Sequence, residues 1–123
     1  MANEITITAR LAVRHGNLYI TEDPGSISLT QSSPLHVGGT QVIPSASHAA
    51  LDLNDVTTRG YCYMRNTDTS KHITLGTDSS GTFIPFAHLE PGEFCLFRMG
   101  AAVVPYAKAD TGTANLHYTI LAD

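Results

Sequence analysis

Charge, cysteine and long apolar runs are all scarce in this chain of 123 residues. Charged residues make up 15% of the sequence, against about 25% in an average soluble protein. The seven Lys and Arg residues are scattered and form no basic patch for nucleic-acid phosphates. No run reaches the roughly 18 apolar residues that a membrane-spanning helix needs. The opening MANEITITAR also lacks the basic and apolar regions of a signal peptide. We therefore expect no nucleic-acid or membrane partner, and synthesis and folding in a cytoplasm.

The two cysteines, Cys62 and Cys95, lie inside apolar runs and are too far apart for a C-x-x-C motif. We expect two buried free thiols that pack as small hydrophobic groups. A disulfide would form only if the strands that carry them were neighbours.

Alternating apolar and polar residues are what the chain does contain. Residues 4–14 place Ile5, Ile7, Leu11 and Val13 on one side, which predicts a half-buried strand. The pattern breaks at residues 15–17 and resumes at Leu18, which predicts a hairpin with a three-residue connection.

Further short strands follow, separated by turn sequences such as Asp-Pro-Gly at residues 23–25. The last strand alternates, with Leu116, Tyr118 and Ile120 on one side. Residues 36–43 suit an edge strand, because prolines flank them, and the apolar run 94–99 suits a central, buried strand. Residues 46–53 offer the one weak helical signal. The pattern predicts about nine to eleven strands in one domain. We expect residues 1–123 to form a single all-β domain, an antiparallel β-sandwich with the jelly roll as one form of it, and residues 1–14 to be an edge strand or arm.

No pattern of catalytic residues accompanies these strands. Six histidines are spread along the chain without metal-ligand spacing, and we expect them in solvent or turns: His15, His36, His48, His72, His88 and His117. Residues 52–55 lack the glycine and distal glutamate of a calcium loop, so we expect an N-cap or turn role for them. Glu90 and Glu93 flank a Pro-Gly turn, which accounts for them without glycoside hydrolysis. We predict no enzyme activity, no cofactor and no metal.

Aromatic residues are concentrated after residue 60, and we expect most of them to fill the core of the sandwich. The alternative is an exposed cluster that binds sugar or protein, such as Tyr61 or Tyr63 beside Asn66 and Asp68. Arg65 and Arg98 interrupt apolar strands and are candidate interface residues.

Four stretches resemble a group of small virion proteins of tailed bacteriophages. They are GYCYMRNTD (60–68), F-x-P-F (83–86), L-x-P-G-E-x-x-L-F-R (89–98) and YAKADTGTANLHYTILAD (106–123), and the opening MANEITITARLAV fits the same group. The resemblance covers most of the chain and is weakest at residues 22–55. It implies a structural β-sandwich of the particle, assembled in the host cytoplasm.

The first functional hypothesis is therefore a capsid decoration, or cement, protein that binds the outer shell and stabilises it. Its partners would be the major capsid protein and copies of itself, in a homo-oligomer expected to be a trimer. A second hypothesis places the protein in the neck, tail or fibre base of the virion. A third is a carbohydrate-binding β-sandwich that recognises a host surface.

Overall fold

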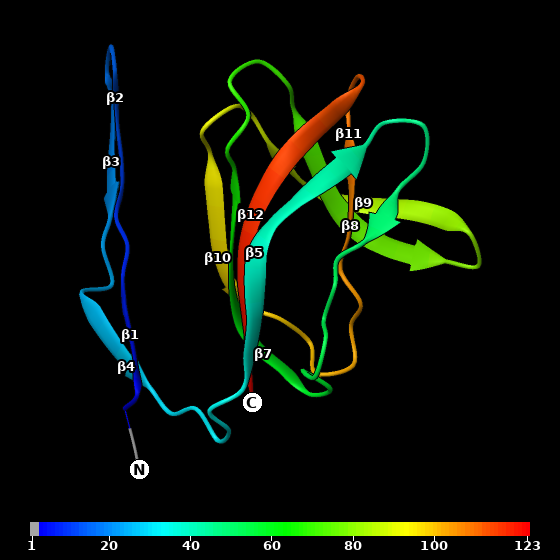
Figure 1. The fold of residues 1–123 in the computed structure, drawn as a ribbon. Coiled ribbons are helices and arrows are strands. Elements are labelled where there is room, and N and C mark those ends of the chain that lie inside the picture. The colour runs from blue at the N-terminus through cyan, green and yellow to red at the C-terminus, as the bar shows by residue number, and fades with distance from the viewer. Residues whose placement is uncertain (1–2) are drawn as a thin grey trace. The chain divides into compact units, whose positions relative to one another are not determined.

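A computed structural model describes residues 3–123, and within that range it contains strands and no helix (Figure 1). The chain divides into two compact units, Met1–Ser32 and Ser33–Asp123. All of the strand pairs are antiparallel. The prediction of an all-β, antiparallel, sandwich-like fold is confirmed. No helix among the described residues is long and apolar enough to cross a membrane.

The first unit is one long β-hairpin, named here the hairpin. Its strands are β1 (Ile5–Thr8), β2 (Leu11–His15), β3 (Leu18–Glu22) and β4 (Ser26–Leu29). β1 pairs with β4 and β2 with β3, so the chain runs out to a tip and returns (Figure 1). His15 pairs with Leu18, so the predicted three-residue connection is wrong. Two residues make the turn, and Gly16 takes the positive φ of 56° that it needs.

An interruption halfway along divides the hairpin into its two ladders. The strand predicted over residues 4–14 therefore divides into β1 and β2. On the returning side, the backbone N–H of Gly25 donates to Asp23 Oδ1 at 2.9 Å. Pro24 has no N–H for a ladder, so this predicted turn separates the two paired regions. The arm predicted at residues 1–14 is thus one side of the hairpin, and residues 1–2 lie outside the described residues.

The second unit contains two four-stranded sheets. The first sheet has the order β10 (Phe94–Arg98), β7 (Arg59–Asn66), β12 (Thr113–Ala122) and β5 (His36–Pro44). The second has the order β6 (Ala49–Ala50), β11 (Tyr106–Ala109), β8 (Ile73–Ser79) and β9 (Thr82–Leu89). The described residues thus form twelve strands, slightly more than predicted. Residues 46–53 contain the short strand β6 and no helical turn.

The core of the second unit is mainly aliphatic. Its fully buried side chains come from both sheets and their loops and include Ile43, Val56, Met64, Ile73, Leu75, Leu116 and Ile120. Tyr118 is the one aromatic residue buried in this cluster, and its hydroxyl donates to the Asp52 carbonyl at 2.8 Å. The prediction that aromatics fill the core is therefore wrong. Aliphatic side chains fill it, and most of the other aromatic residues are half-buried, with Phe97 packed against the edge of the cluster.

The placement of two strands tests the sequence reasoning directly. β5 is an edge strand of the first sheet, as predicted from its flanking prolines. β10 was predicted to be central and buried from its apolar run, and this is wrong, because β10 is the opposite edge of the same sheet. Its ends, Phe94 and Arg98, are exposed. The apolar run of β10 therefore reflects an outward face on which the apolar Phe94 stays exposed.

Both cysteines are free, and Cys62 is buried while Cys95 is half-buried. They lie on neighbouring strands, but Cys62 pairs with Phe97 and Cys95 with Met64. Diagonal neighbours of this kind have Cα atoms about 7–8 Å apart, beyond disulfide reach. Burial raises the pKa of the Cys62 thiol to about 12 and that of Cys95 to about 11. Neither thiol is a ready nucleophile.

Candidate interaction surfaces

The outward face of β7 and β10 carries both predicted interface arginines. The register pairs Arg65 with Phe94, Tyr63 with Leu96, and Tyr61 with Arg98. Successive side chains of a strand point to opposite sides, and Cys62 and Met64 point into the core. The six outward residues therefore share one face, named here the tyrosine–arginine face: Tyr61, Tyr63, Arg65, Phe94, Leu96 and Arg98.

Both arginines have partners within their own fold. Nη1 of Arg98 lies 3.3 Å from Oδ2 of Asp123, and its guanidinium lies 5.5 Å from the centre of the Tyr61 ring. The Nε of Arg65 donates to the Gly92 carbonyl at 3.2 Å. Both side chains nevertheless belong to exposed residues, so further donors can face a partner. Their role at an interface stays a prediction.

Two stacked aromatic rings lie on the same face as the arginines. The rings of Tyr63 and Phe94 are 5.8 Å apart and inclined by 25°, and His117 from β12 meets Tyr63 edge-on. Phe94 is exposed although it is one of the largest apolar residues of the chain. Aromatic and Arg side chains are enriched at protein interfaces, so this face has the composition of a contact surface.

The four residues proposed for sugar binding do not form one site. Tyr61 and Tyr63 point outward, whereas Asn66 is fully buried. The Asp68 carboxylate accepts backbone N–H groups of Ser70 and Lys71. These bonds, that of Ser70 first, hold the pKa of Asp68 below its usual value. Asp68 is therefore occupied as a turn acceptor.

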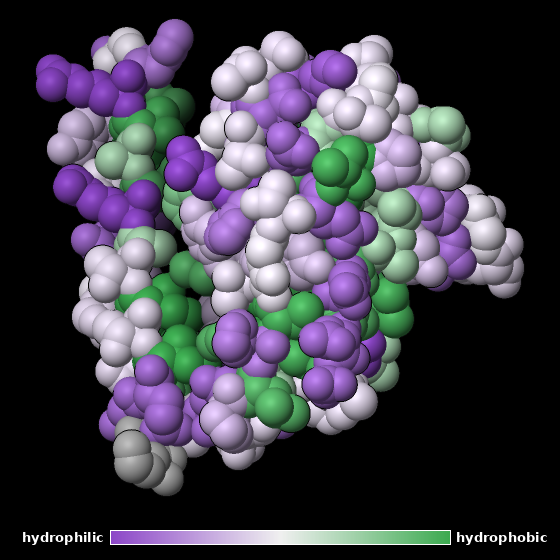
Figure 2. Space-filling view, in the orientation of Figure 1, coloured by the Kyte–Doolittle hydropathy of each residue, from purple (hydrophilic) through white to green (hydrophobic). Residues whose placement is uncertain are grey.

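The hairpin offers a second exposed surface. Cross-strand pairing puts Leu11, Val13, Leu18 and Ile20 on one face of the β2–β3 ladder. Leu11 is 60% exposed, Leu18 48% and Ile20 42%. Figure 2 shows hydrophobic residues reaching the surface in this part of the hairpin.

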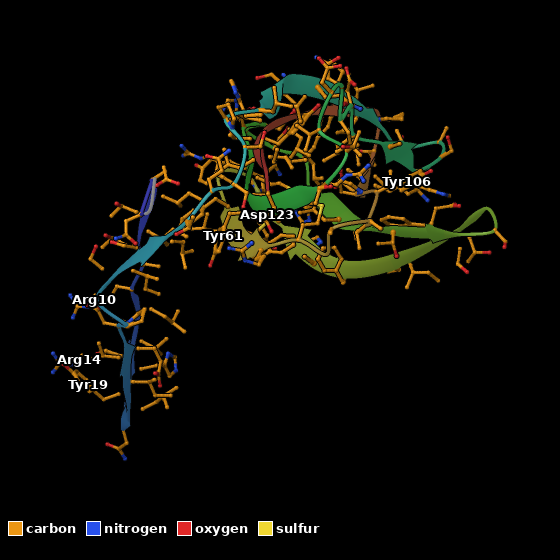
Figure 3. All side chains as sticks on the ribbon, turned by 90° about the horizontal axis from the view of Figure 1, so that it is seen from below. Arg10, Arg14, Tyr19, Tyr61, Tyr106 and Asp123 are labelled. Carbon is orange, nitrogen blue, oxygen red and sulfur yellow. The ribbon has the colours of Figure 1, made fainter. Side chains whose placement is uncertain are left out.

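The opposite face of the hairpin is charged and aromatic. Arg14 pairs with Tyr19 across the ladder, and Arg10, Arg14 and Tyr19 project from the same side of the hairpin (Figure 3). Within the described residues, each hairpin strand has one paired neighbour, so its other edge is unpaired. Unpaired edges and an apolar face are features that a neighbouring chain can use.

The histidines occupy more varied places than the solvent and turn positions expected. His48 is half-buried, stacks on Phe83, and lies 2.6 Å from Oδ1 of Asp78. This hydrogen bond holds the pKa of the Asp78 carboxyl below its usual value. The rings of His72 and His88 meet edge-on, with their centres 5.0 Å apart. These contacts between strands were invisible in the linear spacing.

The predicted turns account for the acidic pairs considered above. The N–H of Glu93 donates to the Glu90 carbonyl at 3.0 Å, and Gly92 has a φ of 85°, as a turn through Pro91 and Gly92 requires. The N–H of Asn54 donates to Asp52 Oδ1 at 3.0 Å. Both acidic segments are therefore turn structures, as predicted.

Comparison with models of known protein families, with curated protein sequences and with solved structures found no match to this chain.

Proposed function

We propose that this protein is a structural component of a tailed-bacteriophage virion and that it binds the outer capsid surface as a decoration protein. It acts by binding other chains, with no catalytic step. The sequence motifs that resemble small phage virion proteins give the first support. The fold and the exposed surfaces add two independent lines of support.

The strand order supports a jelly roll for the second unit. Among the strands β5 to β12, the first lies beside the last (β5–β12) and the second beside the seventh (β6–β11). The third lies beside the sixth (β7–β10) and the fourth beside the fifth (β8–β9). This nested pairing is how a chain winds into a jelly roll, an architecture common among viral capsid proteins and lectins.

The hairpin is the single observation that carries the proposal. A two-stranded ribbon alone in water is marginally stable. This one also exposes leucine and isoleucine side chains on one face and leaves its strand edges unpaired. Docking on a neighbouring chain would bury the apolar face and pair an edge. We therefore propose that the hairpin binds the shell protein, or another copy of this chain in an oligomer expected to be a trimer.

Many modest contacts are sufficient on a capsid. Each copy that joins a lattice brings its other surfaces to high effective concentration beside their partners. The tyrosine–arginine face would supply a second contact of this kind. The low overall charge of the chain is consistent with extensive coverage of its surface.

The first experiment is to measure the copy number of this chain in purified particles by quantitative mass spectrometry against the major shell protein. A ratio near one, or a simple fraction of it, supports decoration of the capsid. A few copies per particle would instead place the protein in the neck, tail or fibre base. Absence from the particle would refute both virion assignments.

A matched pair of variants tests the role of the hairpin. Leu11→Ser with Leu18→Ser removes apolar side chains from one face of the β2–β3 ladder. Ala12→Ser with Thr21→Ser changes the opposite face of the same ladder and is the control. We expect the first variant to lose particle binding in a sedimentation assay and the control to keep it. Equal binding by both would refute a docking role for this apolar face.

The stacked Tyr63 and Phe94 rings favour one further candidate, a carbohydrate-binding sandwich. The chain has no tryptophan, so tyrosine emission is its natural fluorescence signal. Binding of host-surface glycans would quench this emission, and Phe94→Ala would weaken the effect. No change across a panel of bacterial surface glycans would remove this candidate.

A further inference from the structure

A one-residue shift in the β8–β9 ladder aligns three metal-binding side chains. From Ser79–Thr82 to Gly76–Pro85 the two strands pair one to one. Leu75 then pairs with Ala87, so Phe86 is the extra residue of a β-bulge. Beyond the bulge, Ile73 pairs with Leu89, which places the next residue of each strand, His72 and Glu90, opposite each other.

The same register puts His88 on the face that carries His72 and Glu90. Residues two apart on one strand share a face, so His88 lies beside Glu90. Ile73 and Leu89 are buried, so this face points away from the core. The three side chains, His72, His88 and Glu90, are named here the His–His–Glu cluster.

The distances within the cluster suit one ion after a small adjustment. One ligand atom from each side chain lies within 4.8 Å of the other two, and no other such group occurs among residues 3–123. His88 Nε2 lies 3.9 Å from Glu90 Oε1. Ligands of a tetrahedral zinc ion are separated by roughly 3.4 Å, given bonds of about 2.1 Å. The side chains of His88 and Glu90 are 50% and 59% exposed, so they are free to rotate inward.

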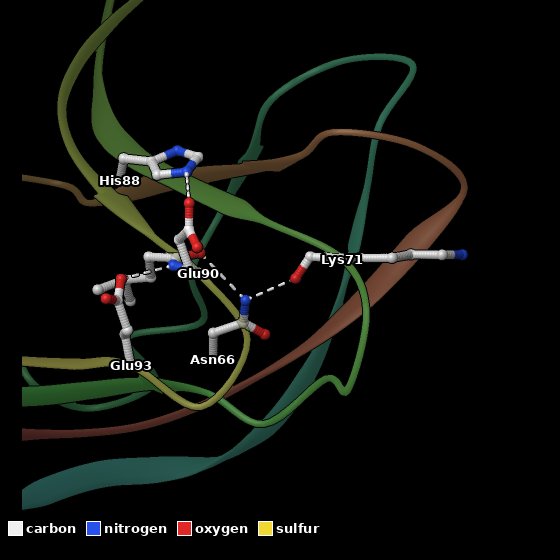
Figure 4. A network of polar contacts seen from close by, with 6 residues as sticks. Asn66, Lys71, His88, Glu90 and Glu93 are labelled. Carbon is white, nitrogen blue, oxygen red and sulfur yellow. Dashed lines mark hydrogen bonds and ion pairs between the residues drawn. The ribbon is translucent and has the colours of Figure 1, made fainter.

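Hydrogen bonds from Asn66 hold the backbone beneath the cluster in place (Figure 4). Nδ2 of the buried Asn66 donates to the carbonyls of Lys71 and Leu89, at 2.7 Å and 3.1 Å. Lys71 directly precedes His72, and Leu89 lies between His88 and Glu90 in the sequence.

Two more hydrogen bonds complete this support. The N–H of Asp110 donates to the His72 carbonyl at 3.1 Å, and the N–H of Glu90 donates to Glu93 Oε1 at 2.8 Å. Each ligand therefore projects from a fixed backbone, and only side-chain rotations are left to order.

The charges closest to the cluster are mixed: Lys108, opposite Thr74, lies on the same face as His88, and a second carboxylate lies at the turn. Lys71 is a neighbour of the cluster in sequence, but its ammonium group points away from His88 and Glu90 (Figure 4). The carboxylate at the turn is that of Glu93. Two imidazole nitrogens and a carboxylate oxygen are donors that zinc and the neighbouring divalent transition metals prefer.

We propose that His72, His88 and Glu90 bind a divalent transition-metal ion, with zinc as the expected ion. Three protein ligands leave at least one coordination position for water. The ion would join the start of β8 to the end of β9 and to the turn that leads into β10. This inference does not depend on the proposed virion function.

The test is a calorimetric titration of the full-length protein with Zn²⁺. We expect one ion per chain for the wild type. His88→Gln and Glu90→Gln should each lower the affinity at least about tenfold, since even loss of a residue that only orients a ligand costs about 10–100-fold. The double variant His72→Gln with His88→Gln should abolish binding. The matched control, His36→Gln with His117→Gln, changes two histidines of the first sheet and should bind as the wild type does.

A spectroscopic readout locates the ion without any substitution. Imidazole nitrogen signals in ¹H–¹⁵N spectra should shift for His72 and His88 when Zn²⁺ is added, and those of His15 and His36 should stay. Circular dichroism without metal checks that each variant is folded. Absence of binding by the wild type at about 1 mM Zn²⁺, or equal weakening by the control, would overturn the proposal.

Discussion

Replacing the buried Asn66 by alanine should destabilise the second unit strongly. Asn66 is 0% exposed and lies at the end of β7, where its side chain joins three backbone segments. Its Nδ2 donates to the Lys71 and Leu89 carbonyls, and its Oδ1 accepts the N–H of Asp68 at 3.0 Å. Alanine supplies none of these bonds.

The size of the loss in stability depends on whether water can replace each lost hydrogen bond. The bond to Leu89 is buried, so its carbonyl is orphaned at a cost of about 1–3 kcal/mol. The bonds to Lys71 and from Asp68 are partly buried, and water can replace part of each, which leaves about 0.5–1.5 kcal/mol apiece. The expected loss in free energy of unfolding is therefore about 2–6 kcal/mol, a large share of the roughly 5–15 kcal/mol of a typical domain.

Urea denaturation monitored by circular dichroism measures this loss. Asn115→Ala is the matched control, because Asn115 is an exposed asparagine on β12 and its loss should change stability by less than about 0.5 kcal/mol. Asn66→Asp tests the donors, since it keeps the shape but turns an acceptor toward two carbonyls, and it should destabilise at least as much as alanine at neutral pH. A loss below about 1 kcal/mol for Asn66→Ala would refute the assigned role.

Two further predictions concern the backbone and the thiols. Gly76→Ala should lower the free energy of unfolding by about 2 kcal/mol or more, measured by urea denaturation. A Cβ at this position would collide with the Ile84 carbonyl and lie 2.8 Å from the Pro85 Cα. Ser79→Ala on the same strand is the neutral control. Burial raises the pKa of Cys62 from 9.0 to about 12, so above pH 9.0 the unfolded chain releases a proton that the folded chain keeps. The free energy of unfolding should therefore fall as the pH rises from about 9 toward 12, and Cys62→Ala should make this fall shallower; an unchanged slope would contradict the burial of the thiol.

The sequence predicted the features that depend on local pattern. Period-two alternation identified the hairpin strands and the terminal strand with Leu116, Tyr118 and Ile120 buried. Proline and glycine chemistry located the turns at residues 23–25 and 90–93. These features need only neighbouring residues, so one sequence is enough to find them.

Features that depend on register were out of reach. Counting back from the β8–β9 turn without a bulge would pair His72 with Leu89, and His88 would then lie on the opposite face from His72. The extra residue at Phe86 decides the outcome. Gly76 and Pro85 are residue types that mark bulges, but they do not specify which residue is the extra one. The His–His–Glu cluster was therefore hidden among six scattered histidines.

The burial of Asn66 was also missed, although the sequence contained a signal for it. Asn66 shares the parity of Cys62 and Met64 along β7, which places all three on the inward face. The chemistry of an asparagine beside tyrosines suggested a sugar site instead. The aromatic residues misled for a related reason, since apolar character predicts burial but does not say which apolar residues are left outside.

The central position of β12 has a consequence for how the chain acquires its structure. β12 lies between β5 and β7 and pairs with both. The hydroxyl of Tyr118 on this strand donates to the Asp52 carbonyl, 66 positions away along the chain. Such distant pairing requires closure of a large loop before it stabilises anything, which places folding on the slow, millisecond-to-second scale. Until β12 inserts, β5 and β7 have unpaired edges that other molecules can reach. In a newly made chain, pairing with its own β12 therefore competes with strand pairing to a neighbouring chain.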